Sequence, residues 1–552
     1  MGGCCETNYR KSQDFLFGVS EKNAFCFKDV VPIKYHHYLK EYEFEKNLPS
    51  VKERTKISLL KNRVSGKRYV CKSISYYNPQ SEKAILQEVD LLSKLDHPNI
   101  PKIIEVFIYQ STAHIVKEQT IFKLLIFSIR FCRGGFLTQW LSNNKNLSEK
   151  MIISLVKQLL SAINYLHNEC IVHREIRLTS VLINTDKQGN VYIQLMSFDN
   201  AVQLSYRDQN LTNVLPGMEF TAPEIFIGKY DRKIDEYAAG VLMYYLLSGQ
   251  EFPFKLSSQN NDKEQFWGLM SQELQFNHQV WSNYENILLI KEVLEGLLNR
   301  DMTKRWSAKK ALKHDLFKHT QTEIQQDISQ NLIRDNMQFR PTIKRRRMNI
   351  IKRGMLLYIA TRLLPEQRYG ELTQLFQVLD SNGDGYLLKD SLKQQLKPQY
   401  GENSQVLRDL DKMFHLFADK RTGKINFSDF IAAMIELRGE VDDNIIKKTF
   451  CMISGNDENK NVTRQQLFDT IKNSSTNANK AKEFVKQMDK TIDKFQIQKV
   501  GNGFNDTSKT TNDNEQTNTG FLNRLNTIDR KNTIQEERII SFDTFRKIMK
   551  QQ

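Results

Sequence analysis

One change of pattern along the chain limits the possible folds more than any other feature. Between about residues 41 and 318, short runs typical of β strands come first, such as RYVCKSI and LLIFSIRFC, and long helical patterns follow, such as SEKMIISLVKQLLSAINYLHNE. This order predicts a small sheet-rich lobe and then a larger helical lobe, which makes the fold class α+β. Because 552 residues are too many for one core, we expect further folded units.

The regions on either side of these lobes have different patterns. Residues 1–40 show little periodicity. Residues 319–365 form a basic amphipathic junction, in which apolar residues recur on one helical face at Met348, Ile351, Met355, Ile359 and Leu363. Residues 366–552 are helical between polar loops, and a stretch rich in Asn and Thr near 500–533 predicts a disordered insertion.

Composition narrows the class of protein. No apolar run approaches the ~18 residues that a membrane-spanning helix requires. The seven cysteines include no C-x-x-C pair, which is typical of a reducing compartment. The net charge of +16 is consistent with binding to nucleic acid, to an anionic membrane or to an acidic partner helix. Its densest cluster, KRRRMNIIKR, comes without a nucleic-acid-binding motif, so we expect no nucleic acid partner; the alternative is a nuclear-localisation signal.

Several motifs follow one another in the two predicted lobes. YVCKSI contains Lys72, ILQEVDLLSKLDHPNI contains Glu88, and TAPEIF, KIDEYAAG and RDMTKRWSAKKAL come later. From Tyr42 to Phe317 the chain thus resembles a eukaryotic Ser/Thr protein kinase, which implies a bilobal fold. The resemblance implies that Lys72 holds the α- and β-phosphates of ATP and pairs with Glu88. It also implies structural roles for Glu224 with Arg305, for Asp235 and Gly240, and for a stack of Leu92, His173 and Phe198.

The residues that handle phosphate, metal and hydroxyl depart from the family pattern. SVKERTKI stands where the glycine-rich loop G-x-G-x-x-G-x-V is expected. Ser197 replaces the metal-binding aspartate of D-F-G, and Ser180 replaces the asparagine that binds the second metal. In IVHREIRLTSVLIN, Glu175 replaces the catalytic aspartate and Arg177 the nearby lysine. Because Mg²⁺ prefers carboxylate oxygens, and ~1 Å of misplacement can cost about 100-fold in rate, we expect weakened use of ATP and Mg²⁺.

A second resemblance follows the kinase region. LFQVLDSNGDGYLLKDSL resembles an EF-hand calcium loop, with Asp380, Asn382 and Asp384 as side-chain ligands and the main-chain carbonyl of Tyr386 as a further one. The position that normally carries a bidentate glutamate is Ser391. Since that residue supplies two of about seven oxygens, we expect calcium to bind this hand weakly.

Three more helix-loop-helix units are traceable, and all are more degenerate. ADKRTGKINFSDF keeps Gly423 but has Ala418 and Lys420 at the first two side-chain ligand positions. The third loop, in GNDENKNVTRQQL, ends at Gln466 in place of an acidic residue. Only the last part of the fourth unit, IISFDTFRKIM, can be recognised. We expect an all-α, calmodulin-like EF-hand domain with one ion site; the alternative is a metal-free packing module.

The kinase region, junction and EF-hands together resemble the calcium-dependent protein kinases of plants and protists, over about Tyr42 to Lys550. In that family the junction blocks the active site until the EF-hand lobe binds calcium and then binds the junction. Here IKRRRMNIIKRGMLLYIATRLL has the anchor spacing of a helix that binds in a groove. We therefore expect the junction helix to bind the EF-hand lobe of the same chain.

The amino terminus predicts attachment to a membrane. MGGCC offers Gly2 for myristoylation and Cys4 and Cys5 for palmitoylation, which together give the two signals that stable anchoring needs. Glu6 departs from the preferred Ser or Thr, and the alternative is an ordinary disordered tail. We expect the cytoplasmic face of a membrane, with membrane lipid as a partner, and otherwise the cytoplasm.

Three functions are consistent with these patterns. The first is a membrane-anchored pseudokinase that serves as a scaffold or allosteric regulator of an unknown protein partner. The second is an active, calcium-regulated Ser/Thr kinase that transfers the γ-phosphate of ATP to an unknown substrate, with Glu175 and Asp199 in altered roles. The third is an EF-hand calcium-binding adaptor in which the kinase fold is passive.

Overall fold

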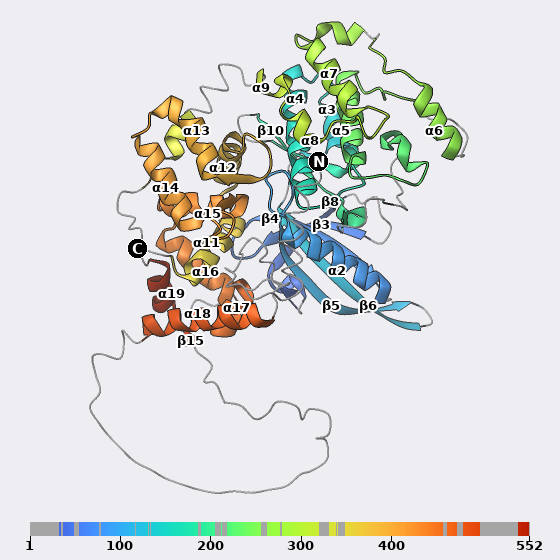
Figure 1. The fold of residues 1–552 in the computed structure, drawn as a ribbon. Helices are drawn as coiled ribbons and strands as arrows, with labels where there is room; N and C mark the ends of the chain where they lie inside the picture. The colour runs from blue at the N-terminus through green and yellow to red at the C-terminus, as the bar shows by residue number, and fades with distance from the viewer. Residues whose placement is uncertain are drawn as a thin grey trace, which may run out of the picture.

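The computed structural model contains a sheet-rich lobe, a larger helical lobe and a third helical lobe beside them (Figure 1). None of the helices whose residues are described is long and apolar enough to span a bilayer. The description covers residues 33–34, 37–48, 55–76, 79–115, 118–130, 132, 134–185, 189–204, 211, 218–255, 262–276, 279–319, 331–337, 339, 348–455, 461–471, 478–496 and 539–550. The expected insertion near 500–533 and most of residues 1–40 lie outside it.

A sheet of six strands and one helix form the small lobe. The strand order is β1-β5-β6-β4-β3-β2, and β1 pairs in parallel with β5. The strands are β1 (Ile33–Lys34), β2 (Tyr42–Leu48), β3 (Thr55–Asn62), β4 (Arg68–Tyr76), β5 (Ile103–Ile115) and β6 (Glu118–Arg130), and the helix is α2 (Pro79–Lys94). Because β1 precedes residue 41, the amino-terminal segment contributes a strand to this lobe.

The large lobe is built around two buried helices. Helix α4 (Glu149–Asn168) begins at Ser148, whose side chain accepts a hydrogen bond from the Met151 N–H and so caps the helix. Helix α5 (Ile234–Leu247) packs against α4 and is buried on almost every side. The remaining helices are α3 (Leu137–Asn143), α6 (Asp262–Ser271), α7 (Ile287–Leu297), α8 (Ala308–Ala311) and α9 (Asp315–His319). Short strands complete this lobe: β7 (Gly135–Phe136), β8 (Ile171–Val172), β9 (Val181–Thr185), β10 (Val191–Leu195) and β11 (Val202–Gln203).

The third lobe consists of helices that join in pairs through two short strand pairings. Strand β12 (Tyr386–Leu388) pairs with β13 (Lys424–Asn426), and β14 (Val462–Thr463) pairs with β15 (Ile539–Ile540). The helices are α11 (Ile350–Arg362), α12 (Glu366–Leu379), α13 (Lys389–Tyr400), α14 (Gln405–Phe417), α15 (Phe427–Leu437), α16 (Asp443–Ser454), α17 (Arg464–Ile471), α18 (Ala478–Gln496) and α19 (Phe542–Met549). The predicted helix-loop-helix units thus form two pairs.

The junction helix α11 lies inside the third lobe. Ile351, Met355 and Ile359, three of the residues on its predicted apolar face, are at most 1% exposed. They belong to the same core cluster as residues of α12, α15 and α19, and α11 packs most closely against α15. The expected intramolecular contact between junction and EF-hand lobe is therefore present in this structure.

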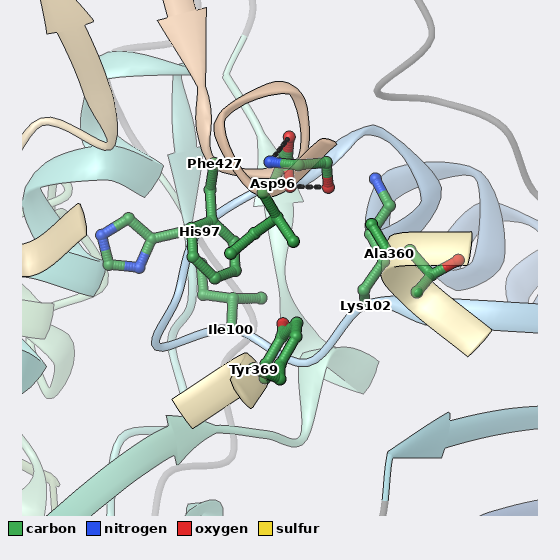
Figure 2. A pocket seen from close by; sticks show the side chains of 10 residues that line it. Asp96, His97, Ile100, Lys102, Ala360, Tyr369 and Phe427 are labelled. Atoms are coloured by element: carbon green, nitrogen blue, oxygen red, sulfur yellow. Dashed lines mark hydrogen bonds between the residues drawn. The ribbon is translucent and has the colours of Figure 1, made fainter. Parts of the chain in front are cut away.

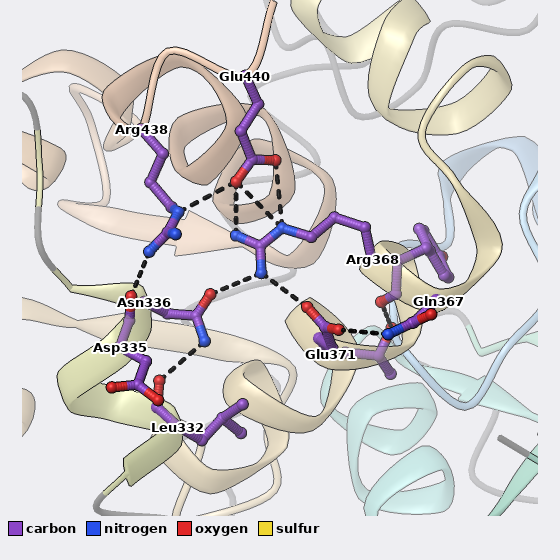
Figure 3. A network of polar contacts seen from close by, with 10 residues as sticks. Leu332, Asp335, Asn336, Gln367, Arg368, Glu371, Arg438 and Glu440 are labelled. Carbon is purple, nitrogen blue, oxygen red and sulfur yellow. Dashed lines mark hydrogen bonds and ion pairs between the residues drawn. The ribbon is translucent and has the colours of Figure 1, made fainter. Parts of the chain in front are cut away.

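A polar network fixes the start of the junction to the third lobe (Figure 3). Arg368 Nη2 lies 2.7 Å from Glu440 Oε1, and Arg368 Nη1 donates to Asn336 Oδ1 at 2.7 Å. Glu440 also accepts a hydrogen bond from Arg438 at 3.1 Å. Because Asn336 precedes the junction helix and Glu440 follows α15, this network joins segments about 100 residues apart.

Candidate nucleotide site and calcium-sensor lobe

Lys72 lies between two carboxylates. Its Nζ is 2.8 Å from Glu88 Oε1 on α2 and 2.8 Å from Asp199 Oδ1 on the short 3-10 helix Phe198–Asn200. Burial alone would lower the pKa of the Lys72 ammonium, but Glu88 and Asp199 raise it above its ordinary value. The structure thus brings together three of the residues that the sequence assigned to the nucleotide site.

Ser197 directly precedes the 3-10 helix that carries Asp199. Its backbone has φ +67°, a left-handed conformation that few residues other than glycine adopt. The next residue, Phe198, is 3% exposed and meets His173 edge to face with ring centroids 4.8 Å apart. The backbone thus makes a left-handed turn at Ser197, but the carboxylate that contacts Lys72 belongs to Asp199, two residues later.

The carboxylate of Glu175 is held by the protein itself. Its Oε1 accepts a hydrogen bond from Arg177 Nη2 at 2.5 Å, and its Oε2 accepts one from Asn200 Nδ2 at 2.8 Å. The Glu175 side chain is only 4% exposed. Both oxygens therefore already have partners at the position where the family places a base for the substrate hydroxyl.

Ser180 stabilises the catalytic loop. Its Oγ donates to the Arg177 carbonyl at 2.8 Å and accepts from the Arg177 N–H at 2.9 Å. The residue is completely buried. The hydroxyl thus completes the turn of the loop, where the family has a metal-binding amide.

The residues that support the catalytic loop make the contacts that the resemblance implies. Asp235 accepts hydrogen bonds from the N–H groups of His173 and Arg174 at 2.8 and 2.9 Å. His167 Nε2 lies 3.0 Å from the same carboxylate. Burial would lower the pKa of His167, but Glu236 and Asp235 raise it to about 9. This buried charge network holds the loop against α5.

A second buried pair closes the large lobe. Arg305 Nη2 donates to Glu224 Oε2 at 2.9 Å, and both residues are at most 5% exposed. Gly240 on α5 faces α7 so closely that an added Cβ would lie 3.0 Å from Leu297. The family positions that hold the fold together therefore keep their contacts.

The described residues do not fit the usual pair of Mg²⁺ ligands. Among them, no group of three or more acidic, His or Cys side chains could hold a metal ion. The Ser180 hydroxyl is used by its own loop, and Asp199 is paired with Lys72. Lys72 fits a nucleotide phosphate, and Nε of Arg177 is buried without a hydrogen-bond partner in the described structure. Ser50 and Lys52, where the sequence lacks the phosphate-loop glycines, lie outside the described residues.

The first EF-hand places its predicted ligands together. Asp384 N–H lies 3.2 Å from Asp380 Oδ1, and Asn382 Nδ2 lies 3.3 Å from Asp384 Oδ2. Burial and the neighbouring Asp384 raise the pKa of Asp380 to about 7, as expected where two carboxylates face each other. These oxygens fit calcium in kind, together with the Tyr386 carbonyl, but Ser391 is exposed on α13 and leaves the shell incomplete.

The same hand rests on the large lobe. Asn164 Nδ2 on α4 donates to the Gly383 carbonyl at 2.9 Å, and Tyr386 Oη donates to Glu169 Oε1 at 2.5 Å. Gly385 has φ +76°, and a Cβ there would lie 2.6 Å from the ring of Tyr165. The calcium loop is thus itself a contact surface for the kinase fold.

The second hand contacts the turn before β5. Ser428 donates through its Oγ to Asp96 Oδ1 at 2.6 Å and through its N–H to Asp96 Oδ2 at 3.0 Å. Figure 2 shows this contact beside a small pocket between the lobes, where Tyr369 and Phe427 face Ile100. The lobes therefore meet through buried polar and apolar contacts together.

The end of the junction helix reaches the small lobe. Arg362 Nη2 donates to the Ile104 carbonyl at 2.6 Å and lies 3.8 Å from Glu105 Oε2. Its guanidinium stacks 4.3 Å from the ring centroid of Tyr358. Tyr69 Oη donates to the Arg362 carbonyl at 3.3 Å. This arginine, 5% exposed between the lobes, connects the junction to the sheet that carries Lys72.

Sequence reasoning did not find the residues that join the lobes. Asp96, Ser428 and Arg362 act between segments more than 250 residues apart, and no local pattern marks such pairs. Asn200, which holds Glu175, was also missed, although its place directly after Asp199 offered a signal. The predicted acylation residues, Gly2, Cys4 and Cys5, lie outside the described residues.

Comparisons with known proteins agree with this arrangement. Residues 53–317 match the family model of the protein kinase domain, and residues 371–435 match that of the EF-hand domain pair. Calcium-dependent protein kinase 5 of Plasmodium berghei (strain Anka) is 26% identical over 428 residues, which cover 77% of this chain and 71% of the relative. The chain is a calcium-dependent-protein-kinase-like protein.

Two further relatives are also named as calcium-dependent protein kinases. Calcium-dependent protein kinase 5 of Plasmodium falciparum (isolate 3D7) is 27% identical over 432 residues, covering 78% of this chain and 71% of the relative. Calcium-dependent protein kinase 4 of the same organism is 24% identical over 454 residues, covering 79% and 81%. The predicted family and the predicted fold class, a bilobal kinase fold followed by helical EF-hands, are confirmed for this calcium-dependent-protein-kinase-like protein.

Proposed function

We propose that this calcium-dependent-protein-kinase-like protein is catalytically impaired and regulates a protein partner as a scaffold or allosteric subunit. The kinase fold then serves as a rigid body on which the EF-hand lobe is docked. One observation carries the proposal: both oxygens of Glu175 are held by Arg177 and Asn200. The two contacts and the burial of its side chain fix this carboxylate in place and restrict the access of a substrate hydroxyl to it, and positioning supplies most of the rate in phosphoryl transfer.

The hydroxyl of Ser180 supports the same proposal. Because its Oγ both donates to and accepts from the main chain of Arg177, metal ligation by this hydroxyl would compete with contacts that stabilise the loop. Loss of the base and loss of a metal ligand act on one step, so the two effects compound. ATP and Mg²⁺ are then weak ligands, and calcium is a weak ligand of the first hand.

A second candidate function is slow, calcium-regulated phosphoryl transfer from ATP. Two observations favour it: Asp199 lies 2.8 Å from Lys72, and Nε of Arg177 is a buried donor without a described partner. A nucleotide phosphate would satisfy that donor, and Asp199 is the more exposed of the two carboxylates beside Lys72, at 26% against 8% for Glu88, so a metal could share it.

Binding of a fluorescent ATP analogue separates the two candidates. The first predicts that binding is weak and changes little when Mg²⁺ is removed or when Asp199→Ala is introduced. The second predicts that Mg²⁺ tightens binding and that Asp199→Ala abolishes this gain, while Lys72→Met removes binding altogether. Mg²⁺-dependent tightening that requires Asp199 contradicts catalytic impairment by loss of metal.

We also propose that Gly2, Cys4 and Cys5 carry acyl chains that hold the protein at the cytoplasmic face of a membrane. Two chains give stable attachment where one gives only marginal binding. Incorporation of labelled myristate in cells, with Gly2→Ala as the control, tests the first chain. Equal labelling of both proteins, or recovery of unlabelled wild type from the cytoplasm, contradicts this proposal.

A further inference from the structure

The second EF-hand contains a positive charge from another part of the chain. Its loop runs from Ala418 to Asp429, and Asp429 stands at the twelfth position, where a calcium-binding hand has its closing acid. Ala418 and Lys420 at the first and third positions provide no carboxylate. Gly423 keeps the left-handed turn with φ +68°. The loop thus retains its shape and its closing acid but not a donor set that fits calcium.

Arg353 of the junction helix pairs with that acid. Its Nη2 donates to Asp429 Oδ1 at 2.9 Å, and its Nε lies 3.3 Å from the same oxygen. Nη2 also donates to the carbonyl of Phe417 at 2.9 Å. Phe417 is the last residue of α14, where the helix dipole is negative, and Asp429 lies in the first turn of α15. One guanidinium therefore joins the helix that enters the loop to the helix that leaves it.

Asp429 is buried, so its charge needs this partner. The residue is 4% exposed, and its other oxygen accepts a hydrogen bond from Asn426 Nδ2 at 3.0 Å. Burial raises the pKa of Asp429, and Arg353 opposes that shift. A buried carboxylate deprived of its counter-charge is strongly destabilising. The acid that would otherwise hold a calcium ion is thus neutralised from within the chain.

The residue before Arg353 makes a parallel contact. Lys352 Nζ lies 2.6 Å from Glu436 Oε1, and the two side chains are 5% and 15% exposed. Glu436 follows Asp429 by seven residues, two turns along α15, so one face of this helix holds both cations. Ser428, next to Asp429, makes the contact with Asp96 of the kinase fold.

We propose that the Arg353 guanidinium replaces calcium in the second EF-hand and keeps the junction helix in the third lobe when no calcium is bound. The cation is covalently part of the junction, so filling the hand and capturing the junction are one event. Through Ser428 the same loop stays against the kinase fold. This inference does not depend on whether the kinase fold transfers phosphate.

Hydrogen exchange of the full-length protein tests the inference, with residues 350–362 followed in excess calcium and in chelator. Wild type is expected to exchange at rates within about twofold in the two conditions. Arg353→Met is expected to exchange about tenfold faster or more in chelator, because breaking a buried charge pair is costly. Arg546→Met is the matched control, because Arg546 pairs with Asp443 in the same lobe but is 46% exposed; no change is expected there.

Two results would overturn the inference. One is fast exchange of residues 350–362 in wild type once calcium is removed. The other is equal exchange of Arg353→Met and wild type in chelator, which would assign the capture to apolar packing alone. If Arg353→Met does not fold, Asp429→Asn takes its place, since it removes the opposite charge, and wild-type exchange in that variant equally overturns the inference.

Discussion

Replacing Arg362 with methionine should weaken the whole assembly, because this residue joins the junction to the small lobe. The substitution keeps an unbranched side chain but removes the donor to the Ile104 carbonyl and leaves Glu105, 2% exposed, without its cation. Breaking a buried charge pair costs about 3–5 kcal/mol. Since the Arg362 to Glu105 distance is 3.8 Å, longer than a charged hydrogen bond, we take the lower value of about 3 kcal/mol.

Calorimetry converts this figure into a measurable shift. For a unit of this size, each kcal/mol moves Tm by about 2–4 °C, so Arg362→Met should lower the Tm of the kinase fold by about 6–12 °C. Arg68→Met is the matched control, because Arg68 pairs with Glu45 on the same sheet but its side chain is 59% exposed. A shift no larger than that of Arg68→Met would mean that the contact between junction and sheet contributes nothing to the stability of the kinase fold.

Three further predictions concern the charge network, the docked loop and the ion site. Because the pKa of His167 is raised from 6.5 to about 9, its protonated form stabilises the fold fully below pH 6.5 and loses that contribution as the pH rises through about 9; His167→Gln should flatten denaturant stability between these values. Gly385→Ala should lower Tm clearly more than Gly423→Ala, since both have positive φ but only the first would clash, with Tyr165; equal shifts would mean that the loop is not docked. Asp380→Ala should abolish calcium uptake measured by calorimetry, and unchanged uptake would exclude the first hand as the site.

Local patterns predicted most of the fold because the elements have strong periodicity. The apolar face of the junction, with Ile351, Met355 and Ile359, is buried in the EF-hand lobe as the helical spacing indicated. The order of strands and helices gave the two kinase lobes, since sequential elements pack close together. The strand Ile33–Lys34 was missed, because two residues are too few to show an alternating pattern.

The part of the site in which the resemblance assigns each residue a single role could be predicted from the sequence. Lys72 and Glu88 meet as the resemblance implied. Two outcomes could not be read from the sequence, because they depend on distances between segments remote in the chain. One is the pairing of Asp199 with Lys72, and the other is the pairing of Arg353 with Asp429. From the sequence alone, the basic run that contains Arg353 is equally consistent with a cluster of charges on the surface.

Transfer of labelled γ-phosphate from ATP to a generic protein acceptor distinguishes a catalytically impaired protein from a working kinase. Wild type would be compared with Lys72→Met as the blank and with a variant that restores the family residues, Glu175→Asp, Ser180→Asn and Ser197→Asp, each with calcium and with chelator. We expect transfer by wild type to equal the blank in both conditions, while activity of the restored variant would show that the fold and the acceptor are adequate. Transfer by wild type above the blank would contradict catalytic impairment, and its dependence on calcium would show that the sensor lobe controls a working kinase.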